Sequence, residues 1–266
     1  MQIFKCPRTS LICLSRWALV FVLFSAQAQE KQEDQQVPPL VLSPAQIHQG
    51  AAALYQKRLA ELDAAHWLDT DADFLLKARR ALARLQAQAA LDFPESRAWQ
   101  WDVHTSVEPL ETAYAMAGGK LLIGLEQARL WNLSETELAM LIAHEMAHAL
   151  LAHNQEEYEF VLDQFPEWRL RSFAELEQAV DHDEHLIKAL APLGKEQELQ
   201  ADQAGWRLAV RAGYPAAGLL SFFKKLVKQA GYPNFESASH PAPAQRYARA
   251  RQWAIAPDDS AASNAR

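Results

Sequence analysis

Residues 144–148 read His-Glu-Met-Ala-His, and this short stretch decides which fold we expect. It lies in a helical pattern that begins after Ser134, where a Ser-x-x-Glu capping box stands. Four residues turn a helix by about 400°, so His144 and His148 share one face with their Cβ atoms ~5–6 Å apart. Both imidazoles can therefore reach one metal ion, such as zinc. Glu145, beside the first histidine, can take a proton from a water on that metal.

The motif alone leaves an alternative open, because His-Glu-x-x-His also arises by chance as polar positions on an amphipathic helix. The metzincin pattern is excluded, because it requires Gly at 151 and His at 154, whereas the chain has Leu151 and Asn154. His153 lies nine residues after His144, half a turn round the helix, so it faces elsewhere unless the helix breaks. We therefore expect His153 at the surface or behind a ligand, not on the metal.

A candidate for the third ligand lies about fifty residues later, in residues 196–205. As a helix, this segment places Glu198, Asp202 and Gly205 on one stripe. Glu198 can complete the metal site, and Asp202 can hold a ligating histidine through its other ring nitrogen. Gly205 would let two helices approach closely. The alternative is a solvated acidic helix face, which we favour for such a segment alone but not beside a His-Glu-x-x-His motif.

The combined motifs resemble the zinc metallopeptidase family of the CAAX prenyl protease, HtpX and BepA. The segments that carry the resemblance are His144-Glu145-x-x-His148, Glu198-x-x-Ala201-Asp202-x-x-Gly205 and Ala212-Gly213-Tyr214-Pro215. Two further segments are similar to the family's: Thr112-Ala113-Tyr114 with Gly118-Gly119, and Ser239-His240-Pro241 followed by Arg246. The resemblance covers about residues 40–255.

This resemblance implies an α+β, mainly α fold. The expected structure is a zincin, more narrowly a gluzincin, metallopeptidase domain with a small β-sheet or hairpin beside the helix of residues 144–148. It also implies one Zn²⁺ per chain, bound by His144, His148 and Glu198. Glu145 would be the general base, and Asp202 would stand behind a ligand.

The resemblance implies further residues around the metal. His240 corresponds to a catalytic histidine that approaches the metal; the alternative is a loop histidine before a proline. The stretch 113–123 would form an edge strand to which a substrate peptide adds as a further strand. The candidate substrate-binding residues are therefore Ala113, Tyr114, Gly118 and Gly119.

Two positions depart from the family's pattern. Thr112 stands where the family usually has asparagine, so an amide that faces the substrate is missing. Gln200 stands where glutamate is commoner, which leaves the expected zinc ligands unchanged. The sequence has no hydrophobic span after residue 28 and no helical-repeat extension, so it looks like a small stand-alone periplasmic member.

The N-terminus has the pattern of a secretory signal peptide. Basic residues precede an apolar run at 17–24, and Ala26-Gln27-Ala28 follows as a cleavage site. We expect a signal peptide at 1–28; the alternative is an uncleaved N-terminal anchor. Residues 1–28 contain both cysteines of the chain, so the exported part could form no disulfide.

The rest of the chain predicts one domain between two unstructured ends. We expect a flexible linker at 29–42, the metallopeptidase domain at 43–255 and a disordered tail at 256–266. Helices are expected at 43–66 and 70–92, with a capping box at Thr70, followed by a strand at 99–104 and a hairpin at 112–123. Beyond residue 125 the patterns up to 254 are helical.

Residues 154–195 are rich in glutamate and aromatic side chains. We expect them to form one or two helices that cover the cleft; one interpretation is that these helices act as a lid. Residues 181–185 read Asp-His-Asp-Glu-His, which favours a solvated turn over a metal site.

Together these features predict a zinc-dependent endopeptidase of the cell envelope, in the periplasm of a Gram-negative bacterium. The family implies misfolded or unassembled periplasmic and outer-membrane proteins as substrates, with peripheral association with the membrane or outer-membrane assembly machinery. The net charge of −7 argues against nucleic acid as a partner. The alternative is a chaperone or assembly factor with a mainly structural zinc site, which Thr112 and the aromatic segment 154–195 motivate. An intact Glu145 argues against it, because a structural zinc needs no general base.

Overall fold

The computed structural model describes residues 40, 42–109, 111–237 and 240–255. The expected signal peptide at 1–28, most of the linker at 29–42 and the tail at 256–266 lie outside the described residues. The described elements all belong to the unit Pro38–Arg266.

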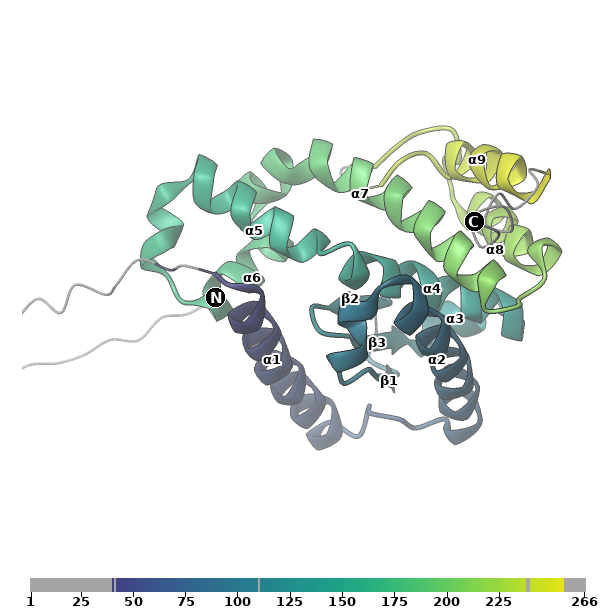
Figure 1. The fold of residues 1–266 in the computed structure, drawn as a ribbon, viewed down its shortest axis with the longest axis horizontal. Helices are drawn as coiled ribbons and strands as arrows, with labels where there is room; N and C mark the ends of the chain where they lie inside the picture. Colours follow the sequence, from purple (N-terminus) through teal and green to yellow (C-terminus); the bar gives the residue numbers. More distant parts are fainter. Residues whose placement is uncertain (1–39, 41, 110, 238–239, 256–266) are drawn as a thin grey trace, which may run out of the picture. The chain divides into compact units, whose positions relative to one another are not determined.

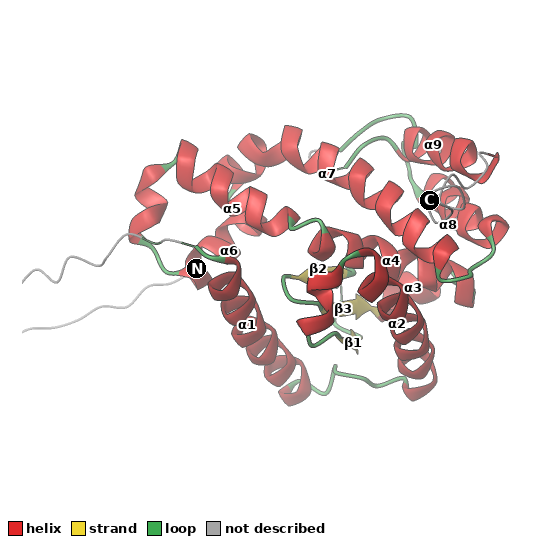
Figure 2. Ribbon diagram, in the orientation of Figure 1, coloured by secondary structure: helices red, strands yellow, loops and turns green. Residues whose placement is uncertain are grey.

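The described part is mainly helical with one small sheet, which confirms the α+β, mainly α fold (Figures 1 and 2). The longer helices are α1 (Pro44–Ala64), α2 (Ala72–Asp92), α4 (Glu135–Leu150), α5 (His153–Gln164), α6 (Phe173–His182), α7 (Glu184–Arg211), α8 (Ala216–Gln229) and α9 (Pro243–Ile255). The short elements are α3 (Leu125–Leu130), the 3-10 helices η1 (Pro94–Ala98) and η2 (Pro166–Leu170), and the strands β1 (Asp102–Ser106), β2 (Tyr114–Met116) and β3 (Lys120–Gly124).

The first two helices begin at capped N-termini, and the cap of the second is not the expected one. Ser43 caps α1 and forms a capping box with Gln46. The cap of α2 is Asp71 and not Thr70: the Asp71 carboxylate accepts a hydrogen bond from the Phe74 amide at 3.0 Å. The same carboxylate pairs with Arg129 at 2.6 Å, which holds Asp71 at the helix end. The helix therefore begins one residue later than a box at Thr70 requires.

The sheet has the strand order β1-β3-β2. β1 runs parallel to β3, and β2 runs antiparallel to it, so β2 is an edge strand. The expected hairpin is the β2–β3 pair, and its turn needs glycine because Gly118 and Gly119 have φ of 76° and 83°.

The strand expected at 99–104 begins only at Asp102. Residues 94–98 form η1 instead, and Trp99 and Trp101 pack on each other with ring centroids 5.4 Å apart. Trp101 also covers the hairpin turn, where a Cβ on Gly119 would come within 2.7 Å of its ring. The alternation that predicted a strand at Trp99 and Trp101 therefore reflects their packing, and neither residue belongs to β1.

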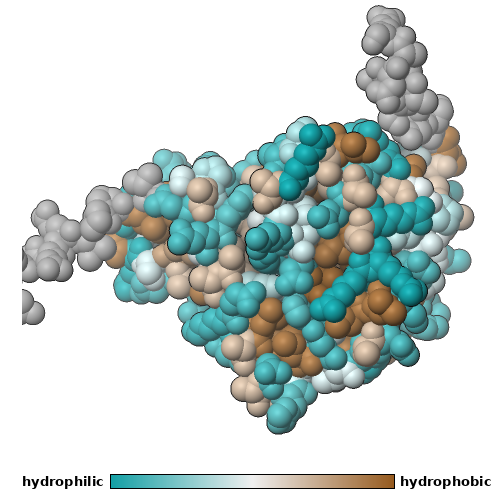
Figure 3. Space-filling model, turned by 60° about the horizontal axis from the view of Figure 1, so that its bottom comes forward, coloured by the Kyte–Doolittle hydropathy of each residue, from teal (hydrophilic) through white to brown (hydrophobic). Residues whose placement is uncertain are grey.

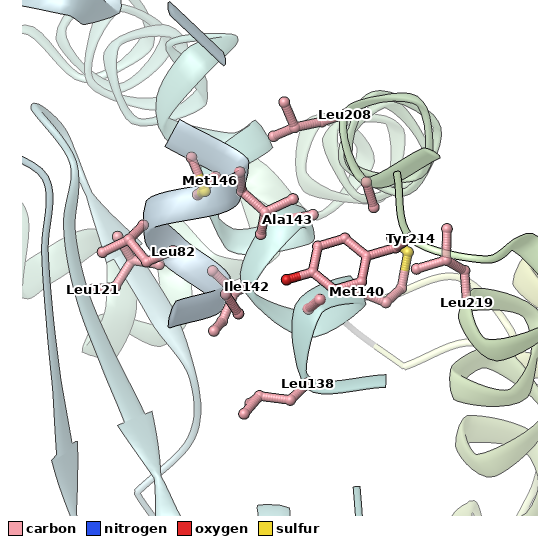
Figure 4. Packing of buried hydrophobic residues seen from close by; sticks show 14 of the residues in the cluster. Leu82, Leu121, Leu138, Met140, Ile142, Ala143, Met146, Leu208, Tyr214 and Leu219 are labelled. Atoms are coloured by element: carbon pink, nitrogen blue, oxygen red, sulfur yellow. The ribbon is translucent and has the colours of Figure 1, made fainter. Parts of the chain in front are cut away.

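The helix α4 forms the centre of the main core and contacts α2, β2, α7 and α8. Figure 4 shows its apolar side chains pointing to two sides: Ile142 lies toward Leu82 and Leu121, whereas Met140 lies toward Tyr214 and Leu219. This explains why most residues of α4 are buried. Burial on all sides makes α4 a rigid support for the side chains that it carries.

Gly205 lets α7 lie directly against α4, as the sequence predicted (Figure 1). A Cβ at this position would come within 2.8 Å of the Ala143 carbonyl oxygen, which is backbone and cannot swing away. The close approach brings the acidic side chains of α7 to the histidines of α4.

We expect Gly205→Ala to lower the free energy of unfolding by about 1–3 kcal/mol, because the added methyl group must push two packed helices apart. Urea unfolding measures the change. The matched control is Gly231→Ala, since a Cβ there would meet nothing within 4 Å. Equal stability of the two variants would show that the contact between the helices is looser than described.

Residues 154–195 form a second, smaller core with α1. Tyr158, Val161, Leu176 and Leu186 are buried there together with Ile47.

The surface of the molecule carries apolar residues as well. On the face in Figure 3, they gather among polar ones toward the lower half. Among the described residues, no helix combines the length and apolar character that crossing a membrane requires.

Candidate metal centre

Three side chains from two helices converge beside the cleft: His144 and His148 from α4, and Glu198 from α7. One ligand atom of each lies within 4.8 Å of the others. Nε2 of His148 is 3.3 Å from Nε2 of His144 and 3.3 Å from Oε1 of Glu198. Ligands of a tetrahedral metal at ~2.0–2.1 Å lie about 3.3–3.5 Å apart. The three groups therefore have the spacing of ligands around one small cation.

The charges around His144 suit a cation as well. Burial opposes the protonated imidazole, but Glu198 and Asp202 outweigh it and raise the pKa of His144 to about 10. Burial likewise opposes the ionised form of Glu198, yet His144 and Arg246 hold its pKa well below the usual range. The centre thus stabilises positive charge between two carboxylates, and a bound metal ion supplies such a charge.

Asp202 lies behind His144, where the sequence predicted it. Its Oδ1 is 3.1 Å from Nδ1 of His144, which leaves Nε2 facing Glu198. A carboxylate in this position fixes the orientation of a ligating ring. Among the described residues, Nδ1 of His144 and Oε2 of Glu198 are buried without a well-aligned hydrogen bond, so charge contacts with their neighbours hold them.

Arg246 of α9 is the residue of this centre to which we gave no role from the sequence. Its Nε and Nη2 donate to Oδ2 and Oδ1 of Asp202, both at 2.7 Å, and its Nη1 is 3.0 Å from Oε2 of Glu198. Burial works against the ionised Asp202, but Arg246 and His144 outweigh it and lower the pKa of Asp202. The signal was present, because Arg246 closes the His-Pro…Arg segment. The pairing itself joins residues 44 positions apart, and no local pattern reveals it.

His153 corrects the expectation that it faces elsewhere or lies at the surface. The helix does break: α4 ends at Leu150, Ala152 adopts a left-handed φ of 59°, and α5 begins at His153. His153 is buried with its Nδ1 3.0 Å from Nδ1 of His148 and its Nε2 3.2 Å from Oε1 of Gln200. It therefore stands behind His148, which was the other alternative.

The contacts of His153 define one consistent arrangement of protons. Burial lowers the pKa of His153 to about 4, so its ring is neutral. If Nε2 of His148 faces a metal, Nδ1 of His148 donates to Nδ1 of His153, and Nε2 of His153 donates to Gln200. Gln200, a departure from the family pattern, is thus the last acceptor in this series of hydrogen bonds.

We expect His153→Leu, which keeps the bulk but removes both nitrogens, to weaken metal affinity about 10–100-fold. Titration against a chelating dye measures the affinity directly. His185→Leu is the control, because His185 is exposed and far along α7 from the centre. Unchanged affinity in His153→Leu would limit His153 to packing.

A cavity of about 1550 Å³ opens beside the centre, and its lining includes His144, Glu145, His240 and Arg246. Burial raises the pKa of Glu145 to about 7, which suits a base that must gain and lose a proton near neutral pH. His240 is half exposed, and its Nε2 is 3.6 Å from Oε1 of Glu198. The structure therefore brings both predicted catalytic residues to the same cavity.

The four predicted substrate-binding residues are not all at this cavity. Ala113 lines it, as does Thr112. Tyr114 is not in the lining, and Gly118 and Gly119 form the hairpin turn against His48 and Trp101.

The segment 154–195 does not cover this cavity, contrary to our expectation. None of its residues is in the lining. Its aromatic side chains pack on one another and on α1, so they serve the second core. The loop after α8 borders the cavity instead, with Tyr232 and Phe235. Residues 181–185 are exposed, as expected, but only Asp183 lies between the end of α6 and the start of α7. Its carboxylate caps α7 by accepting from the amides of His185 and Leu186.

The comparison with known families agrees with this geometry. The model of peptidase family M48 matches residues 77–254, two thirds of the chain. The chain belongs to peptidase family M48. The match confirms the resemblance, although it begins in α2 and leaves out α1. It contains the whole centre, and M48 peptidases are metal-dependent. None of the curated proteins matches the chain.

Proposed function

We propose that this M48 protein is a zinc-dependent endopeptidase of the cell envelope that hydrolyses peptide bonds in misfolded or unassembled periplasmic and outer-membrane proteins. The observation that carries the proposal is the spacing of the three ligand groups, 3.3–3.5 Å apart, with Glu145 in the adjoining cavity. Two imidazoles and one carboxylate are a ligand set of catalytic zinc sites, which keep a further position for water or substrate.

The residues of the centre have distinct roles in this hydrolysis. When bound, zinc polarises the scissile carbonyl and lowers the pKa of a water molecule. The Glu145 carboxylate takes a proton from the attacking water and later gives it to the nitrogen of the leaving amine. His240, which lines the cavity close to Glu198, is placed to donate a hydrogen bond to the oxygen that gains negative charge. Asp202 and Arg246 hold His144 and Glu198 in position.

Unfolded chains are the substrates that fit this site best. β2 is an edge strand, and Ala113, which precedes it, lines the cavity. An extended peptide can add to such an edge, whereas a folded domain has no extended free segment to offer. This supports protein quality control as the process. The signal-peptide pattern at 1–28 supports the periplasm as the location.

The test compares one substrate protein in its folded form and in a permanently unfolded, reduced and alkylated form. We expect the zinc-loaded protein to cleave the unfolded form within the chain and to spare the folded one. A chelator should stop the cleavage, and zinc should restore it. Failure to cleave with zinc bound, together with suppression of aggregation, would favour the chaperone alternative.

The location is tested by N-terminal sequencing of protein from the periplasmic fraction. The sequence should begin at Gln29; a chain that still begins at Met1 contradicts cleavage of the signal peptide.

A further inference from the structure

The lining of the cavity beside the centre combines polar and apolar side chains. Its polar groups include Glu145 and the imidazoles of His144 and His240. Side chains of α3, α4 and α8 and of the segment between α3 and α4 form an apolar wall: Leu130, Trp131, Leu133, Leu141, Phe222 and Leu226. A peptide held at the centre therefore meets apolar surface in the same cavity.

The apolar wall begins within one helical turn of the general base. Leu141 and Glu145 both line the cavity from α4, four residues apart and so on the same face. Four residues rise by about 6 Å along a helix, which is less than two residues of an extended chain at ~3.3 Å each. A side chain that reaches this wall thus belongs to a residue next to the bond being cleaved or one beyond it.

Exposed apolar side chains gather at this cavity. Leu130, Tyr232 and Phe235 are 74%, 79% and 72% exposed, and all three line it. The other large apolar side chains that are exposed among the described residues lie outside its lining: Trp67, Leu76, Leu91, Leu170 and Ile255. A cluster of exposed apolar groups at a cavity marks a place where an apolar ligand is bound.

Three of the charged residues in the lining are held by ion pairs. Arg129 pairs with Asp71 at 2.6 Å, and Glu236 pairs with Lys195 at 2.7 Å. Glu111 is held by Arg58 at 2.6 Å. These pairs offset three of the charges in the lining. Glu126 is a further exposed acid there, which disfavours an acidic substrate side chain.

We propose that the apolar wall of this cavity binds a bulky apolar side chain of the substrate, so that the protein cleaves beside leucine, isoleucine, methionine or aromatic residues. The inference deepens the proposed endopeptidase function and rests on it. Such side chains are buried in folded proteins and exposed in unfolded ones. The cavity thereby gives the enzyme a chemical means of choosing unfolded chains.

A peptide library with mapped cleavage sites tests the preference. We expect apolar residues to be enriched at one position within two residues of the cleaved bond. Tyr232→Ser/Phe235→Ser, which we call the rim variant, changes two exposed apolar residues of the lining. In this variant KM for an apolar peptide should rise about tenfold while kcat stays within about twofold. The matched control is Leu91→Ser/Leu170→Ser, which removes two side chains of similar exposure, 66% and 65%, outside the cavity.

A binding measurement separates this inference from the proposed function. The affinity of the Glu145→Gln variant is measured for a labelled peptide with a central leucine. A second peptide, with aspartate at the same position, serves for comparison. If no peptide is cleaved but the leucine peptide binds more tightly and the rim substitutions weaken it, the apolar subsite stands and the endopeptidase proposal fails. If peptides are cleaved without apolar enrichment, or if the rim variant behaves as the control does, the subsite is overturned and the endopeptidase proposal stands.

Discussion

Glu145→Gln is expected to lower kcat for an unfolded protein about 10²–10⁴-fold without loss of the metal. Glutamine keeps the size of the side chain but cannot take a proton from the attacking water. Glu145 is not one of the three residues that surround the metal position, so the metal content should stay as in the wild type. Steady-state cleavage of casein and elemental analysis of the same samples measure the two properties.

The control for this variant is Glu159→Gln, which makes the same chemical change at an exposed position of α5. Its kcat should equal that of the wild type. Cleavage by Glu145→Gln at the wild-type rate, with metal bound, would remove Glu145 from the mechanism.

Arg246→Met is expected to lower the free energy of unfolding by about 3–5 kcal/mol. Methionine fills much of the space, but it leaves Asp202, which is fully buried, without the two hydrogen bonds at 2.7 Å. Glu198 loses a positive neighbour in the same substitution. Urea unfolding of the metal-free protein measures the loss.

Arg251→Met serves as the control, since Arg251 is exposed on the same helix α9. A double variant with Asp202→Asn tests the mechanism further. The cost of Arg246→Met should shrink when Asp202 is no longer charged, because there is then no buried carboxylate that has lost its guanidinium partner. Equal costs in both backgrounds would show that Arg246 acts through packing alone.

Local periodicity was enough to predict the parts of the centre that lie on single helices. His144 and His148 share a face because of the helical repeat, and the same argument placed Glu198, Asp202 and Gly205 on one stripe. Gly205 further indicated that two helices meet closely, and the structure brings Gly205 against the Ala143 carbonyl.

What the sequence did not reveal depends on breaks and on long-range pairs. The position of His153 follows from a left-handed residue at Ala152, and alanine carries no signal for that conformation. Arg246 meets Asp202 only because α9 folds back onto α7. One or two helices were expected in 154–195, whereas the segment contains α5, η2, α6 and the start of α7. Its apolar side chains could pack on α1 as well as on the cleft, and composition alone does not decide between the two.

The most direct test of the metal centre is the metal content of the mature protein, wild type beside Glu198→Ala, with casein cleavage measured on both. We predict one zinc per chain in the wild type, and in the variant a loss of zinc together with cleavage. Glu184→Ala, at an exposed position on the same helix, should behave as the wild type does. Full retention of zinc in Glu198→Ala would contradict the assignment of Glu198 as the third ligand, and with it the centre described here.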